Sequence, residues 1–310
     1  MKKHNTAKWF KNTLTVKESI LPRVIYRSLF CGAFGFGISL LDAYRYEVQL
    51  PILATAIPSV VIGLLLVFRT NTAYERFWEG RKLWSNIDVQ IRNISRQILV
   101  IVEEQNPNDA VAKKQAMLLL AGFTISAKQR LQKKLENTQD QNQLNHEYGQ
   151  YLSTRQLGQL TNSTNIPADI LLFLQDYLQI QMHKGNILVN QVSTIQGSIN
   201  SLLDSSMGCE RILRTPIPIA YSIHLKQLLL AYCLTLPFQF VSQLGLWTAP
   251  VVLVVSMALL GIEAIGEEIE NPFGTDINDI NMAGLCDDVV QGIQEIVELQ
   301  PSSPTFKSNK

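Results

Sequence analysis

Residues 48 to 84 read VQLPILATAIPSVVIGLLLVFRTNTAYERFWEGRKLW, and this stretch decides the fold. Its first part, Val48 to Phe68, contains no charged side chain. As a helix this part would rise about 31 Å, which matches the hydrocarbon core of a bilayer. Arginines, aromatic residues and glutamates follow with no turn signal between the two parts. The pattern predicts a membrane-spanning helix, and the alternative is a buried helix of a large soluble protein.

The composition of the whole chain indicates a protein that is membrane-embedded only in part. Of its 310 residues, 46% are hydrophobic, and the mean hydropathy is only +0.08. The net charge of +1 argues against a nucleic-acid partner, because proteins that bind nucleic acid usually carry a basic excess.

Further uncharged runs extend the prediction to four spans. One run is Ser28 to Leu41, and a very long one is Gln227 to Ile262. Pro237 and Gly245 interrupt the long run, so it predicts one helix over about 218–240 and another over about 246–265. Arg23 and Arg27 are expected to extend the short first span by lying at the membrane interface.

Basic residues predict the orientation of these spans. They precede the first span and follow the second, whereas the connection between the two spans has a single arginine; the flanking set is Lys2, Lys3, Lys8, Lys11, Lys17, Arg23, Arg27, Arg69, Arg76, Arg81 and Lys82. Cytoplasmic loops carry the excess of Lys and Arg, so both termini and the interval 69–214 are predicted to be cytoplasmic. No cleavable signal peptide is indicated.

The interval between the two pairs of spans carries helical patterns. Isoleucines recur every three or four residues at Ile87, Ile91, Ile94, Ile98 and Ile101, which indicates one apolar helix face packed in a bundle. Helices are also predicted from Pro167 and through the region of Ile195 to Cys209. Residues 136–165 are rich in Gln and Asn and are predicted to be a loop with short helices at most.

The sequence gives no positive support for an enzyme. Its four cysteines and its histidines are widely scattered, and no nucleophile elbow, phosphate loop or zinc-protease motif is present. By contrast, the segment Glu263 to Glu298 carries many acidic residues and no Lys or Arg. The counter-ions of this segment are either basic residues of the protein or a bound cation such as Ca²⁺. Within it, Asp279 is expected to cap a final helix over Ile280 to Leu299.

Three separated motifs resemble the bestrophin family, in particular its bacterial or chloroplast-type members. They are NTAYERFWEGRKLWSNI at 71–87, CERILRTPIPIAY at 209–221 and ENPFGTDINDI at 270–280. The resemblance implies an all-α membrane protein with four transmembrane helices and a helical cytoplasmic domain around a central pore. The expected divisions are a cytoplasmic arm (1–27), two spans (28–68), a cytoplasmic helical domain (69–214), two further spans (215–265) and an acidic cytoplasmic segment (266–310).

The same resemblance implies a homopentameric channel for small inorganic ions, with a neck lined by the second span. Ile57, Val61 and Leu65 fall at the neck positions when Ile57-Pro58 is taken as the shared anchor. Five copies would form three apolar rings that gate by dewetting, and the alternative is that these side chains contact lipid or another helix. Animal members have phenylalanine where Val61 and Leu65 stand.

The resemblance also implies two further sites. A second constriction is expected at Thr215 or Ile217. The calcium clasp of animal members would correspond to side chains of Asp276 and Asp279 and to backbone carbonyls of Asn271 and Glu268, so Ca²⁺ is the one candidate cofactor.

Chloride, and bicarbonate in a photosynthetic cell, are the expected permeant ions. The alternatives are a monovalent-cation channel of the same fold, a secondary transporter, and a non-conducting membrane scaffold. The expected location is the bacterial inner membrane or the thylakoid membrane, with membrane lipid as a further partner.

Overall fold

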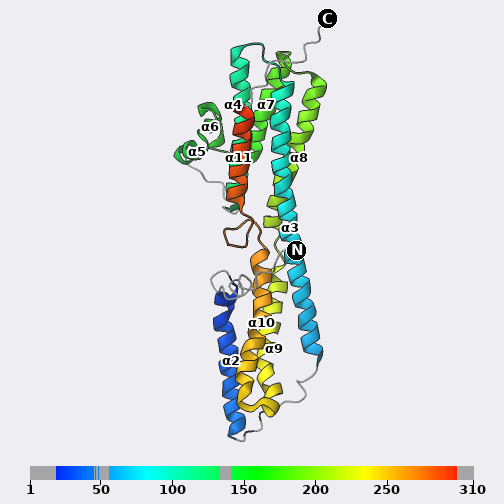
Figure 1. The fold of residues 1–310 in the computed structure, drawn as a ribbon, viewed down its shortest axis with the longest axis vertical. Helices are drawn as coiled ribbons and strands as arrows, with labels where there is room; N and C mark the ends of the chain where they lie inside the picture. Colours follow the sequence, from blue (N-terminus) through cyan, green and yellow to red (C-terminus); the bar gives the residue numbers. More distant parts are fainter. Residues whose placement is uncertain (1–18, 45, 47, 49–55, 133–140, 299–310) are drawn as a thin grey trace, which may run out of the picture. The chain divides into compact units, whose positions relative to one another are not determined.

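A computed structural model describes residues 19–44, 46, 48, 56–132 and 141–298, and these residues form helices and no strand (Figure 1). The α-helices are α2 (Leu21–Ala43), α3 (Ala56–Ile101), α4 (Pro107–Gln132), α5 (Gln141–Tyr148), α6 (Thr154–Leu160), α7 (Ile166–His183), α8 (Val189–Arg214), α9 (Ile219–Leu244), α10 (Thr248–Ile269) and α11 (Met282–Glu298). A short 3-10 helix, η2 (Gly245–Trp247), lies between α9 and α10. The all-helical fold class predicted from the sequence is therefore confirmed.

The chain forms two compact units. The first consists of Met1–Phe77, Pro216–Asn271 and Asp276–Asn278, and the second of Trp78–Thr215, Pro272–Thr275 and Asp279–Lys310. Helix α3 contributes residues to both units. Compactness does not locate a membrane boundary, so the predicted domain limits stay predictions. The predicted N-terminal arm up to residue 18 and the end of the chain from residue 299 lie outside the described residues.

Three segments of the described chain are long and apolar enough to cross a membrane. They are Leu21–Ala43, Ile57–Ile101 and Ile219–Ile269. The third segment contains both α9 and α10, so the three segments hold four helices. Helix α9 continues through Pro237 to Leu244, beyond the end at residue 240 that the sequence predicted. The turn comes at Gly245, whose φ of 53° lies in the left-handed region that favours glycine.

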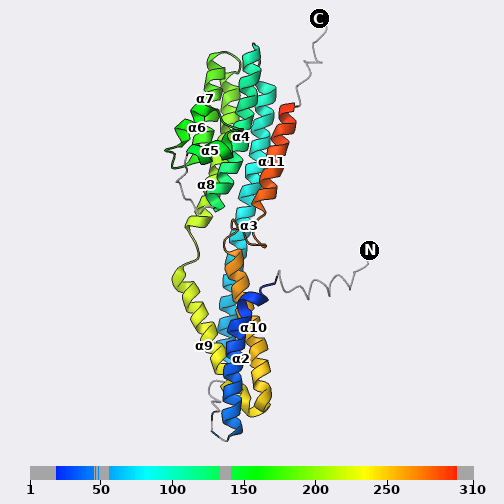
Figure 2. The same ribbon diagram turned by 90° about the vertical axis from the view of Figure 1, so that its left-hand side faces the viewer.

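The core of the first unit joins α2, α9 and α10, which lie side by side in Figures 1 and 2. Helices α2 and α10 are antiparallel, because Arg23 pairs with Glu268 while Gly32 lies against Leu253. A buried apolar cluster continues this packing onto α3; its members are Val24, Ile62, Leu66, Leu225, Leu229, Leu260 and Ala264. The membrane-type helices thus bury one face against each other and leave many apolar side chains exposed.

In the second unit the isoleucine stripe of α3 is buried as predicted. Ile87, Ile91, Ile94 and Ile98 are each at most 1% exposed, and only Ile101 is half-buried. The short helices α5 and α6 occupy the described part of the predicted loop, and residues 136–140 of that loop lie outside the described residues. Helix α4, which was not predicted from the sequence, packs against α7 and α11.

The prediction that Asp279 caps the last helix was wrong. Helix α11 begins at Met282, and the side chain of Asn281 accepts a hydrogen bond of 3.0 Å from the backbone N–H of Gly284. Asn is as good an N-cap as Asp, so composition alone could not choose between two candidates that lie two residues apart.

Candidate functional site

The predicted neck residues occupy the first turns of α3. Ile57 is 71% exposed and Val61 is 47% exposed in the chain. Leu65 is half-buried and packs against the apolar cluster of the first unit, and its carbonyl accepts a hydrogen bond of 3.0 Å from the Tyr221 hydroxyl. Ile57 and Val61 are therefore free to face a pore, a neighbouring subunit or lipid, whereas Leu65 lies at the edge of the buried face.

A second exposed ridge runs beside these residues on the same helix. Val60 is 67% exposed and Leu64 is 54% exposed. The sequence pattern does not distinguish this ridge from that of Ile57 and Val61, because both pairs have the same spacing of four residues. Ile62 and Leu66 are at most 4% exposed, so the buried side of α3 is defined by the structure.

Arg69 ends the apolar part of α3, and the rest of the first unit encloses it almost completely. Its side chain is 2% exposed. One guanidinium nitrogen donates to the Ser222 hydroxyl at 2.7 Å, and the other donates to Glu270 at 3.1 Å. Glu270 also accepts a hydrogen bond of 2.9 Å from the backbone N–H of Ile217. The pair thus ties the end of the apolar helix to the segment just before α9.

The Arg69–Glu270 pair was not predicted from the sequence. The available signal was positional: Arg69 is the first charge after the long apolar run, and Glu270 begins the ENPFGTDINDI motif. A separation of 201 residues hides the partnership from any local pattern. A buried arginine that keeps its charge requires a carboxylate partner, so removal of Glu270 would leave an uncompensated charge.

The two candidate residues for the second constriction differ in exposure. Thr215 is exposed at the end of α8, and its hydroxyl donates a hydrogen bond of 2.6 Å to the carbonyl of Arg211. The side chain of Ile217, in the first unit, is 8% exposed. Thr215 is therefore the better candidate for a side chain that faces an ion path.

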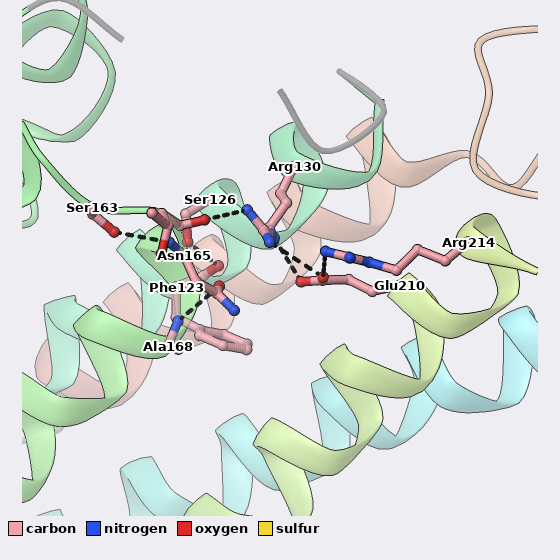
Figure 3. A network of polar contacts seen from close by, with 9 residues as sticks. Phe123, Ser126, Arg130, Ser163, Asn165, Ala168, Glu210 and Arg214 are labelled. Atoms are coloured by element: carbon pink, nitrogen blue, oxygen red, sulfur yellow. Dashed lines mark hydrogen bonds and ion pairs between the residues drawn. The ribbon is translucent and has the colours of Figure 1, made fainter. Parts of the chain in front are cut away.

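A polar network fixes the last turns of α8 within the second unit (Figure 3). Glu210 is 3% exposed and lies between two arginines, with Arg130 of α4 at 2.6 Å and Arg214 at 3.4 Å. Arg130 also donates to the carbonyl of Thr164 at 2.9 Å. Asn165, next to Thr164, accepts from the N–H of Ala168 and so caps α7. The end of α8, which carries Thr215, is therefore held by α4 and by the start of α7.

The residues of the expected calcium clasp form an ion-pair network in the structure. Arg23 donates to Glu268 at 3.1 Å and to Asp276 at 3.3 Å. Asn278 donates to the other oxygen of Glu268 at 2.7 Å. Among the described residues, no group of three or more His, Cys, Asp or Glu side chains is placed to hold a metal.

This arrangement does not fit a calcium clasp. Arg23 already supplies positive charge to Asp276, one of the two expected side-chain ligands. The acidic segment therefore has the basic partner that was one of the two alternatives drawn from the sequence.

The thiols of the second unit are kept protonated by their surroundings. Burial, with Glu210 as a nearby negative charge, raises the pKa of Cys209 to about 12. Burial also raises the pKa of Cys286 to about 12. Because the thiolate is the nucleophile and the metal ligand, neither residue is suited to either role near neutral pH.

The sequence matches a family of known proteins over nearly its whole length. The family model described as bacterial/fungal bestrophin protein matches residues 1–295. A voltage-dependent anion channel-forming protein of Nostoc sp. is 44% identical over 97% of this chain and 94% of its own length. A protein of the same name from Synechocystis sp. is 39% identical over 94% of this chain and 93% of its own.

The fold is also similar to that of solved structures. A crystal structure of a bacterial bestrophin homologue from Klebsiella pneumoniae, which carries a point mutation, superposes with a TM-score of 0.79. The two sequences are 24% identical, and the match covers 88% of this chain and 99% of the other. At this identity the likeness shows a shared fold.

Proposed function

The chain belongs to the bacterial and fungal bestrophin family, and from this premise we propose that it forms a homopentameric channel that conducts small anions. It is an integral membrane protein, and its family indicates a channel and not an enzyme. The relatives from Nostoc and Synechocystis are named as anion channel-forming proteins, which supports the choice of anions.

One observation carries the proposal: the apolar part of α3 exposes side chains at Ile57 and Val61 on the helix face that is not buried in the first unit. One helix cannot enclose a path for ions. Five copies around one axis would convert each exposed residue into an apolar ring, and such rings gate by dewetting. We place the neck at Ile57, Val61 and Leu65, with Thr215 as a second, cytoplasmic ring.

Charge and composition support the rest of the proposal. The basic residues that flank the first two spans favour cytoplasmic termini. The neck residues are aliphatic and do not choose the sign of the permeant ion, so chloride and bicarbonate rest on the named relatives. The inner membrane of a bacterium or a thylakoid membrane is the proposed location.

The first test is the reversal potential of the purified protein in a planar bilayer under a gradient of potassium chloride. We expect the reversal potential to move towards the chloride equilibrium potential, and bicarbonate to carry current when it replaces chloride. Movement towards the potassium equilibrium potential would establish the cation alternative. Absence of current from intact pentamers, with or without Ca²⁺, would favour the scaffold alternative.

A further inference from the structure

A cavity of about 480 Å³ opens among α2, α9 and α10 in the first unit. Its charged lining residues are Arg27, Lys226 and Glu263, and its apolar lining includes Phe30, Leu230 and Leu260. Phe30 is 60% exposed and Leu230 is 45% exposed. Nothing in the proposed path of the ions uses this cavity, because the neck residues belong to α3.

The lining is sorted by polarity along the helices. Phe30 and Leu230 follow Arg27 and Lys226 by about one helical turn, and Leu260 precedes Glu263 by about one turn. Helix α10 is antiparallel to α2 and, through the short turn at Gly245, to α9. All three helices therefore place their charged residue at the same end of the cavity and their apolar residue one turn further along.

The charges at this end are incompletely paired. Lys226 lies 2.9 Å from Glu267 and 3.7 Å from Glu263. Arg27 forms no hydrogen bond or ion pair with any residue that the structure describes. The side chain of Glu263 is 1% exposed, and its Oε1 atom has no hydrogen-bond donor within the described chain. Among the described residues, the cavity lining thus includes one cation without an ion-pair partner, Arg27, and one buried acceptor without a donor, Oε1 of Glu263.

We propose that this cavity binds an anionic membrane lipid whose head group carries hydroxyls, with phosphatidylglycerol as the representative. The lipid phosphate contacts Arg27, a head-group hydroxyl donates to Oε1 of Glu263, and an acyl chain lies along Phe30, Leu230 and Leu260. The sorted lining matches an amphiphile that enters from one leaflet. A buried carboxylate oxygen without a donor is costly, so a hydroxyl at this point stabilises the complex.

The charges favour this ligand over other lipids. Lys226 is shared between two carboxylates, which leaves Arg27 as the cation available to a phosphate. Glu263 already has the Lys226 ammonium group nearby, so it needs a hydrogen-bond donor more than it needs a second positive charge. A phosphatidylcholine head group has no hydroxyl or N–H donor for Glu263. Its phosphate can reach Arg27, but its own quaternary ammonium group offsets the charge of that phosphate, so phosphatidylcholine should bind less tightly.

The test is native mass spectrometry of the intact detergent-solubilised protein, titrated with phosphatidylglycerol or phosphatidylcholine of identical acyl chains. We expect the wild type to prefer phosphatidylglycerol, and Arg27→Gln to reduce this preference about tenfold, as the loss of one charge-assisted hydrogen bond predicts. Arg23→Gln is the matched control, because Arg23 is an exposed arginine one turn earlier on α2 that does not line the cavity. The preference should survive in this control.

Two further variants test the head-group hydroxyl and the acyl chain separately. Glu263→Leu, which removes the acceptor at similar size, should remove the preference for phosphatidylglycerol over phosphatidic acid, which has the phosphate without the hydroxylated glycerol. Leu230→Trp should fill the cavity and reduce binding of phosphatidylglycerol, whereas Leu29→Trp, at an exposed leucine of α2 outside the cavity, should not.

Four outcomes would overturn the proposal. The first is equal binding of phosphatidylglycerol and phosphatidylcholine by the wild type, and the second is an equal loss of lipid preference in Arg27→Gln and Arg23→Gln. The third is displacement of the bound lipid by soluble glycerol phosphate. The fourth is an oligomer that contains no lipid and that dissociates only in Leu230→Trp. The third outcome would indicate a simple anion site, and the fourth a neighbouring subunit in the cavity. The assay measures binding and not ion flow, so its result is independent of the proposed channel.

Discussion

At the scale of single residues, Arg69 and Arg23 show how the first unit neutralises its charges. Arg69 is buried and bound to Glu270 and Ser222, and Arg23 is half-exposed and bridges Glu268 and Asp276. The buried pair positions the segment at Ile217, since Glu270 also accepts from its backbone. Arg23 supplies a positive charge to the acidic segment from within the protein.

The Arg23 bridge predicts that channel activity does not require calcium. Addition of a chelator should leave the bilayer current of the wild type unchanged, because the guanidinium already neutralises Asp276. Arg23→Gln should give a current that responds to added Ca²⁺, since it removes the guanidinium charge from both carboxylates. A wild-type current that a chelator abolishes would contradict this prediction.

If the neck lies at Val61, a serine substitution there should change ion conduction more than a serine substitution at Val60. Val61→Ser should raise single-channel conductance or open probability several-fold, because a hydroxyl ring makes an apolar constriction easier to wet. Val60→Ser is the matched control on the neighbouring ridge of α3. Single-channel recording of both variants decides between the ridges. A larger effect at Val60 would move the neck to the ridge of Val60 and Leu64.

The stability of the second unit should depend on pH, because the fold lowers the pKa of Asp109. The hydrogen bond from Lys184, at 2.9 Å, lowers the pKa of Asp109 below its usual value, and the N–H of Asn106 adds to this effect. A lowered carboxyl pKa stabilises the fold above the unfolded pKa of about 4, and this contribution is lost as pH falls through the folded pKa.

Thermal unfolding of the wild type and of Asp109→Asn between about pH 3 and pH 7 would measure this contribution. The variant should be less stable near neutral pH, and its stability should fall less as the solution is acidified. Asp88→Asn is the control, because Asp88 pairs with Arg92 on the exposed side of α3. Parallel pH profiles for the wild type and Asp109→Asn would count against the assignment.

At the scale of helices, the two parts of α3 differ in how their apolar side chains are covered. Its first part exposes Ile57, Val60, Val61 and Leu64, whereas its later part buries the isoleucine stripe. Ile62 and Leu66 of the first part pack against the other helices of the first unit, but the four exposed side chains have no such apolar cover within the described chain. The exposed apolar part therefore requires lipid or other copies of the chain.

The contact between α2 and α10 predicts contrasting effects of two glycine substitutions. A Cβ atom at Gly32 would lie 3.0 Å from the Cβ of Leu253, whereas a Cβ at Gly37 would meet nothing within 4 Å. Gly32→Ala should therefore destabilise the protein by about 1 kcal/mol, after the gain in helix propensity offsets part of the overpacking. Gly37→Ala should leave the stability equal or higher.

Thermal unfolding of the two alanine variants in the same detergent tests this comparison. A lower melting temperature for Gly32→Ala alone is the expected result. Equal melting temperatures for the two variants would mean that Leu253 moves aside at little cost, and that the approach of α2 to α10 is not a constraint on this position.

At the scale of the whole molecule, the proposed pentameric channel should have the mass of five chains. Native mass spectrometry in detergent should show this species as the dominant one, since apolar rings form only when several chains share an axis. A monomer that nevertheless passes current in a bilayer would require a path within one chain. Such a result would contradict the neck at Ile57, Val61 and Leu65.

The helical class, the apolar segments and the buried isoleucine stripe could all be predicted from the amino-acid sequence. Each of these depends on local periodicity or on the length of an uncharged run, and both are written in consecutive residues. The three motifs at 71–87, 209–221 and 270–280 likewise indicated the family, which the match over residues 1–295 confirmed. The assignments of Ile57, Val61, Leu65, Thr215 and Ile217 stay predictions.

The pairing of charged residues from distant segments could be seen only in the tertiary structure. Arg69 with Glu270, Arg130 with Glu210, and Arg23 with Asp276 are separated by 201, 80 and 253 residues. Ion pairs between distant segments follow no sequence period, so a basic residue and its distant partner can be identified only when packing brings their helices together. For the same reason the cavity lined by Arg27 and the buried Glu263 is a property of three packed helices and not of any one segment.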